Sequence, residues 1–184
     1  PTGGAFGSFM FGIGATDMLG VLVTGKTWIK VPQTICIEWS GQIGTGIAAK
    51  DMALKMCASL GMDGGEYESI LYRGDAVKNL EMFERMTLCN MGAELGGQAA
   101  LIEPDEKTAA YVATAGGNPG NWEKYISDTD SYFKIIHKFD ASKLSPQVAA
   151  PHSPANATDV ENVDEESIDQ FYIGACTGAK YSDL

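Results

Sequence analysis

The chain has 184 residues, of which 45% are hydrophobic and 20% are charged, and its formal net charge is −11 at pH 7. This balance is typical of a folded globular protein, and the length is sufficient to bury a core without disulfides. The acidic charge and the scattered lysines and arginines argue against nucleic-acid binding and against an electrostatic membrane anchor, although a buried site could still bind an anionic substrate.

The N-terminal segment is rich in glycine and apolar residues. It does not begin with Met and has no basic stretch, so it is unlike a signal peptide, and we expect the chain to begin inside a folded segment. The stretch 6–23 is apolar enough to suggest a membrane span, but Asp17 and the glycines argue against one. The glycines predict tight turns and do not follow the order of a phosphate-binding loop.

A strand and then a helix are predicted next. Within Val31–Ser40, apolar and other residues alternate with a period of two, which predicts a strand with one buried face. The segment Ala49–Leu60 is predicted to be a helix, because methionine and leucine recur every four residues and Gly61 can end it.

The following segments alternate between predicted strands and helices. In chain order they are a strand at 69–72, helical segments at 75–79 and 81–95, a helix that begins near Pro104 and ends near Gly116, and a strand at 135–139. The segment 145–164 contains three prolines and many polar residues, so we expect a loop-like linker. A further strand is predicted at 168–174, with Cys176 just beyond its end.

The four cysteines are far apart and irregularly spaced, which favours reduced, buried thiols over disulfides. Cys36, Cys57 and Cys89 lie in strand or helix patterns and are predicted to be core residues. Cys176 lies in a turn of small residues after a predicted strand, where open α/β sheets place ligands, and the alternative is a buried free thiol.

Asn90 and Glu94 are the strongest candidate for a polar site. Four residues apart on a helix, they would share one face, and their apolar neighbours suggest a buried carboxylate with a function, although a solvated polar edge is the alternative. His137 and His152 are isolated, and neither a catalytic triad nor a zinc spacing can be assembled. These features alone indicate a soluble α/β domain.

Local strings nevertheless resemble the aconitase superfamily, over nearly the whole chain and in the family's order. The most specific is Met-Thr-Leu-Cys-Asn-Met-Gly-Ala-Glu at 86–94. Similar strings lie at 3–7, 11–17, 23–32, 48–51 and 173–177. Those at 104–106 and 145–148 fit the isopropylmalate and homoaconitate branch, so the resemblance is closest to the large subunit of 3-isopropylmalate dehydratase, as an internal fragment.

The resemblance implies an α/β fold built of three-layer α/β/α domains. Residues 1–32 would be the end of the first domain, and residues 33–144 the second. Residues 145–184 would be a linker and the start of a third domain, which carries the first cluster cysteine.

The resemblance also implies a reaction and a cofactor. The family dehydrates and rehydrates 2-hydroxy acids, here of the 3-isopropylmalate type, with homoaconitate, dimethylmalate or citrate as alternatives; a non-catalytic remnant is a further alternative. Cys176 matches the first of three thiolates that hold a [4Fe–4S] cluster. Asn90 matches a residue that lines the cluster and substrate, and Glu94 matches an active-site glutamate that handles the iron-bound water or hydroxyl.

Several parts of the family's site are missing from the sequence. The family's Asp-Ser-His-Thr would precede Pro1, its Cys-x-x-Cys would follow Leu184, and Gly178 stands where Asn is usual. The swivelling domain, a small subunit in this branch, is absent too. We therefore expect the chain alone to bind no stable cluster and to be inactive, and the intact enzyme to be cytoplasmic.

Overall fold

The computed structural model describes residues 2–164 and 167–174. Four strands form a parallel sheet in the order β3-β2-β1-β4. The strands are β1 (Thr34–Ser40), β2 (Ser69–Arg73), β3 (Ala99–Ile102) and β4 (Ile135–Asp140). Ile35 of β1 lies opposite Ile70 of β2 and Ile135 of β4. The predicted α/β class is confirmed, and β3 is a strand that the sequence pattern did not reveal.

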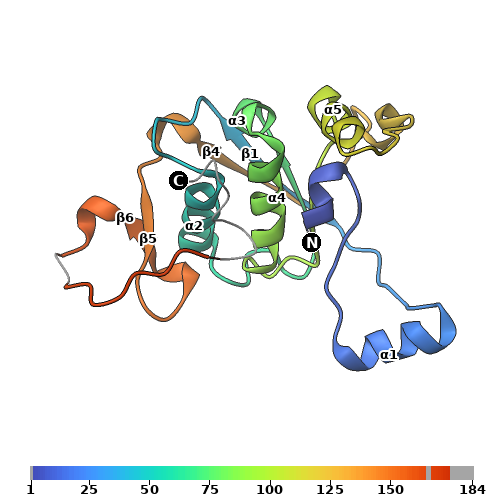
Figure 1. Cartoon of the computed structure of the whole chain (residues 1–184), viewed down its shortest axis with the longest axis horizontal. Helices are drawn as coiled ribbons and strands as arrows, with labels where there is room; N and C mark the ends of the chain where they lie inside the picture. Colours follow the sequence, from blue (N-terminus) through green and yellow to red (C-terminus); the bar gives the residue numbers. More distant parts are fainter. Residues whose placement is uncertain (1, 165–166, 175–184) are drawn as a thin grey trace.

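Helices cover one face of this sheet. They are α2 (Ala49–Leu60), α3 (Asp75–Asn79) and α4 (Met82–Asn90). The helix α5 (Glu106–Thr114) follows β3 and contacts α4. α2 and α4 lie side by side on that face (Figure 1). Ile35 and Trp39 of β1 pack there with Met56 of α2 and Leu88 of α4, each at most 1% exposed. Burial of these side chains is the main term that stabilises the fold.

The opposite face of the sheet is also partly buried. Cys36 is fully buried, although the alternating pattern predicted one buried face only. Leu71 of β2, which lies opposite Cys36, is also buried, at 6% exposure, as is typical of strands in a parallel sheet. Phe133 lies over Arg73 on this side, with the guanidinium carbon 4.9 Å from the ring centre. The strand begins at Thr34, three residues later than predicted.

The segment predicted to be a loop forms a small antiparallel sheet. β5 (Gln147–Ala149) pairs with β6 (Ala157–Asp159), next to the 3-10 turns Ala141–Lys143, Pro154–Asn156 and Val160–Asn162. Asp51 of α2 accepts a hydrogen bond of 2.8 Å from Gln147 N, and the Gln147 side chain donates to Asp159 at 2.5 Å. These bonds hold the hairpin against α2. The expected domain division at residue 145 stays a prediction.

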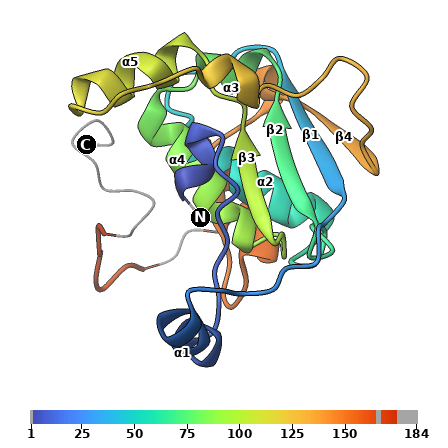
Figure 2. The same ribbon diagram turned by 90° about the vertical axis from the view of Figure 1, so that its right-hand side faces the viewer.

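The N-terminal segment leaves the body of the molecule and returns to it. The 3-10 turn Thr2–Phe6 packs against α4 and β3, with Ala5 fully buried. The helix α1 (Ala15–Thr24) then stands apart from the body and has no buried residue (Figures 1 and 2). Leu22 and Val23 are 76% and 77% exposed. None of the helices described is both long and apolar enough to cross a membrane.

The strand expected at 168–174 is not formed. These residues have no regular structure, and Phe171 and Tyr172 are 78% and 83% exposed. A short run rich in apolar and aromatic residues does not decide the structure without a neighbouring strand to pair with.

Candidate functional site

The candidate site is the turn from Asn90 to Glu94, which follows α4. The α-helix ends at Asn90, and a 3-10 turn, Met91–Ala93, carries the chain to Glu94, whose N–H donates to the carbonyl of Met91 at 3.0 Å. Asn90 and Glu94 therefore do not share the face of one continuous helix, as the spacing had predicted. They lie at the two ends of a tight turn, separated by the three residues Met91–Ala93.

Gly92 explains why the turn lies so close to the sheet. A Cβ atom at this position would be 2.3 Å from the Cβ of Ala100 and 3.4 Å from the hydroxyl of Tyr72. Any side chain would push the turn away from β3 and β2. A glycine is thus required by the close approach, and the turn is held directly over these two strands.

Burial differs between the two ends of the turn. Asn90 is half-buried, whereas Glu94 is exposed, so the expectation of a buried carboxylate is wrong. The 3-10 turn directs Met91 and Leu95 into the core, at 7% and 1% exposure, and leaves Glu94 at the surface. Burial, and secondarily the negative charge of Glu94, raise the pKa of the Cys57 thiol to about 11.

The turn lies at the amino edge of the sheet. Asn90 and Glu94 come shortly before β3, whereas a cavity of about 500 Å³ lies at the other edge. That cavity is lined by residues at the carboxyl ends of β2 and β3, including Arg73, Gly74 and Glu103, and by Trp122. The described site residues are therefore not at the carboxyl edge, where ligands are expected in open α/β sheets.

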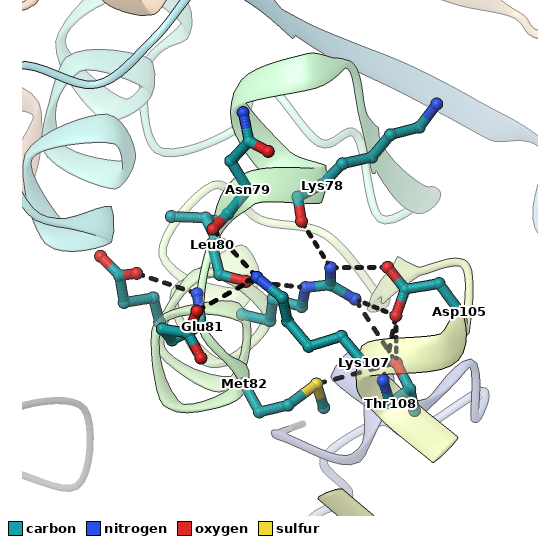
Figure 3. A network of polar contacts seen from close by, with 10 residues as sticks. Lys78, Asn79, Leu80, Glu81, Met82, Asp105, Lys107 and Thr108 are labelled. Atoms are coloured by element: carbon teal, nitrogen blue, oxygen red, sulfur yellow. Dashed lines mark hydrogen bonds and ion pairs between the residues drawn. The ribbon is translucent and has the colours of Figure 1, made fainter. Parts of the chain in front are cut away.

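The start of α4 is fixed by Arg85, which is fully buried. Figure 3 shows the polar network around its partners Lys78, Leu80 and Asp105. Its guanidinium binds both carboxylate oxygens of Asp105, at 2.7 and 2.9 Å, and also donates to the carbonyls of Lys78 and Leu80 at 2.8 and 3.3 Å. Arg85 thus ties the end of α3 and the start of α5 to the helix that carries Asn90. The sequence pattern predicted a helix start near Pro104, but it contained no sign of the pairing between Arg85 and Asp105.

A second support lies after Glu94. Gly65 N and Tyr67 N donate to the carbonyls of Leu95 and Gly96 at 2.6 and 2.8 Å. Glu66 and Tyr67 have φ angles of 47° and 57°. For residues other than glycine this left-handed conformation costs about 1–2 kcal/mol each. No pattern in the sequence predicts two such residues in succession.

The described residues do not by themselves make an iron–sulfur site. Residues 2–164 and 167–174 contain no group of three or more His, Cys, Asp or Glu that could hold a metal ion. Cys36, Cys57 and Cys89 are free, buried thiols, as predicted, and burial raises the pKa of each. A raised pKa disfavours the thiolate that a metal needs. Cys176 and Gly178 lie outside the described residues.

Comparison with known proteins gives one consistent result. Residues 1–170 match the aconitase family (aconitate hydratase). The chain is 42% identical over its full length to a 3-isopropylmalate dehydratase large subunit of Methanopyrus kandleri, and 41% identical over 98% of its length to one of Archaeoglobus fulgidus. It is 40% identical over its full length to a probable methanogen homoaconitase large subunit of Methanothermobacter thermautotrophicus. The chain covers only 42–43% of these relatives.

Proposed function

The chain belongs to the aconitase family, and from this premise we propose that it is a section of a hydro-lyase that isomerises a 2-hydroxy dicarboxylate of the 3-isopropylmalate type. The observation that carries the proposal is 42% identity, over the whole chain, to a protein named as a 3-isopropylmalate dehydratase large subunit. The rest of the site would be supplied by the part of such a protein that this chain does not cover.

In this proposal Glu94 is a catalytic acid and base. Its exposed carboxylate can reach a bound substrate, and the turn that carries it is fixed from both sides, by Arg85 through α4 and by Gly65 and Tyr67 through residues 95–96. The amide of Asn90 can both donate and accept hydrogen bonds, so it suits the orientation of a hydroxyl or carboxylate group. Proton transfer by a positioned carboxylate contributes about 10²- to 10⁴-fold to a rate.

We further propose that the full-length protein holds a [4Fe–4S] cluster, with Cys176 as one of its thiolate ligands. Such a cluster would supply a Lewis acid that weakens the bond to a substrate hydroxyl. The name "large subunit" of the relatives suggests a small subunit as partner. Cytoplasmic location and the domain division at residues 32 and 144 belong to the same proposal.

A second substrate has support from a specific observation. One relative, 40% identical over the whole chain, is named as a probable homoaconitase large subunit. The difference of two percentage points from the first relative does not separate the two substrates. Dimethylmalate and citrate remain candidates from the same superfamily, and a non-catalytic remnant is the alternative outside it.

The proposed function is tested on the full-length protein that contains this chain, assembled with its small subunit and reconstituted anaerobically with iron and sulfide. Turnover is measured with 3-isopropylmalate, homocitrate, 2,3-dimethylmalate and citrate. We expect 3-isopropylmalate to be the best substrate, and Glu94→Gln to lower kcat by about 100-fold or more. Glu123→Gln, a change at an exposed glutamate in the turn Trp122–Tyr125, is the matched control. Full activity of the Glu94→Gln protein would refute the role given to Glu94.

The chain alone provides a separate test. We propose that it binds no stable cluster and has no activity, because Cys176 is its single candidate ligand. Iron and acid-labile sulfide are measured after anaerobic reconstitution of the isolated chain. A stoichiometric cluster on this chain would contradict the proposal.

A further inference from the structure

A short turn at the amino edge of the sheet is built against the residues that follow Glu94. We call Gly65–Glu68 the supporting turn. Besides the bonds from Gly65 N to Leu95 O and from Tyr67 N to Gly96 O, the carbonyl of Glu68 accepts from Gln98 N at 2.9 Å. Three consecutive backbone contacts therefore extend the pairing of β2 with β3 back to the residue after Glu94.

The two segments are also in close steric contact. A Cβ atom on Gly65 would lie 2.6 Å from the backbone nitrogen of Gly97 and 2.8 Å from the carbonyl oxygen of Leu95. Both of these neighbours are backbone atoms, which cannot move aside as a side chain could. The position of residues 95–97 is thus set by the position of the supporting turn.

The supporting turn is itself fixed to the other strands. One carboxylate oxygen of Glu68 accepts from Gln33 N, next to β1, at 2.6 Å. Lys134, next to β4, donates to the other oxygen at 3.1 Å and to Glu66 at 2.5 Å. The turn that supports the segment after Glu94 is therefore anchored at the starts of both β1 and β4.

Tyr67 shows that the backbone conformation, rather than the side chain, is what this turn supplies. The residue is 67% exposed, so packing of its side chain does not account for a φ of 57°. The left-handed conformation of Glu66 and Tyr67 accompanies N–H groups directed at the carbonyls of residues 95 and 96. Unfavourable backbone conformations of this kind persist where the surrounding structure fixes them, and they cluster at functional sites.

We propose that the supporting turn is a positioning element for Glu94, and that the left-handed conformation at Tyr67 sets where the Glu94 carboxylate meets the substrate. The inference rests on the proposed function of Glu94. Tyr67 is a positioning residue and does not touch the reacting atoms. A catalytic group displaced by about 1 Å can lose about 100-fold in rate, so a small change in this backbone has a measurable effect on kcat.

The test is a series of substitutions at residue 67 in the full-length, reconstituted protein. Gly and Asn adopt the left-handed conformation readily, Ala less so, and the β-branched Val resists it. We expect Tyr67→Gly and Tyr67→Asn to keep kcat within about twofold, and Tyr67→Val to lower it by about 10- to 100-fold with little change in KM. Tyr67→Ala, with an intermediate loss, carries the test if Tyr67→Val does not fold. Tyr132→Val, at a tyrosine that is 77% exposed, is the matched control.

A double-mutant cycle with Glu94→Gln separates positioning from general damage. If the turn acts through Glu94, Tyr67→Val adds less than about twofold to the loss already caused by Glu94→Gln. Equal kcat across the residue-67 series, or a full extra loss in the Glu94→Gln background, would overturn the inference while leaving the role of Glu94 intact. An unchanged kcat in the Glu94→Gln protein would instead refute the role proposed for Glu94, and the inference with it.

Discussion

Arg85 and Asp105 form a bidentate ion pair, with distances of 2.7 and 2.9 Å between nitrogen and oxygen, and the Arg85 side chain is fully buried. The pair joins the first turn of α4 to the residue that caps α5, whose side chain also accepts a hydrogen bond from Thr108 N at 3.0 Å. The Arg85 guanidinium also donates to the carbonyls of Lys78 and Leu80 at the end of α3. It therefore binds the end of α3 and the start of α5 at the same time.

Replacing Arg85 should therefore destabilise the whole fold. We expect Arg85→Met to lower the free energy of unfolding by about 3–5 kcal/mol, because it leaves the Asp105 carboxylate and the Lys78 carbonyl without the charged donor of Arg85. The Leu80 carbonyl still accepts from Lys107 at 2.9 Å. Arg73→Met is the control. Arg73 pairs with Glu38 at 3.4 Å, and the two side chains are 39% and 34% exposed. Its loss should cost about 1 kcal/mol or less. Urea unfolding measures the free energy of unfolding of both variants. Equal losses would contradict the structural role given to Arg85.

Much of the fold follows from local patterns in the sequence. The helix Ala49–Leu60 has the bounds predicted from its repeat of apolar residues, since one face packs against the sheet. The strand β3 was not predicted, because Ala99 and Ala100 have low strand propensity and are buried by neighbouring elements. The hairpin β5–β6 was missed because its contacts with Asp51 join residues that are 96 positions apart.

The site was predictable only in part. The string at 86–94 pointed to Asn90 and Glu94, and the structure places them at the two ends of one turn. The end of the helix and the exposure of Glu94 were not predicted, because the packing of Gly92 against Ala100 depends on tertiary contact. The supporting turn was unpredictable for the same reason, since Tyr67 is not a residue that favours a positive φ.

Acid should weaken the contact between Arg85 and Asp105. Burial alone would raise the pKa of Asp105, but hydrogen bonds from Arg85 and Thr108, together with the charge of Arg85, outweigh it and hold the pKa below its usual value. A carboxylate with a lowered folded-state pKa stabilises the protein fully above its unfolded pKa of about 3.9, and this stability is lost as the pH falls through the folded-state pKa.

The substitution Asp105→Asn isolates the contribution of the ionised Asp105 carboxylate to the free energy of unfolding. We expect the wild-type chain to exceed the Asp105→Asn chain in free energy of unfolding at pH 7, and the difference to shrink as the pH falls below about 4. Urea unfolding from pH 7 to pH 3 gives the comparison. A difference that stayed constant over this range would show that the lowered pKa of Asp105 does not contribute.

The buried thiols should be inert in the folded chain. Cys36, Cys57 and Cys89 are each 0% exposed, and their raised pKa values keep them protonated near neutral pH. In the Cys176→Ser chain we expect almost no reaction with Ellman's reagent at pH 8, and reaction of all three remaining thiols once the chain is unfolded. Rapid reaction of any of these thiols before unfolding would contradict their burial.

The helix α1 should contribute little to the stability of the body, because none of its residues is buried. Leu22 is 76% exposed, whereas Leu88 of α4 is fully buried among the core residues. We expect Leu22→Glu to change the free energy of unfolding by less than about 0.5 kcal/mol, as for other exposed positions. Leu88→Ala, the matched control, should lower it by about 2–5 kcal/mol because it leaves a cavity. Urea unfolding of the two variants decides: a loss for Leu22→Glu as large as that for Leu88→Ala would mean that α1 packs against the body in solution.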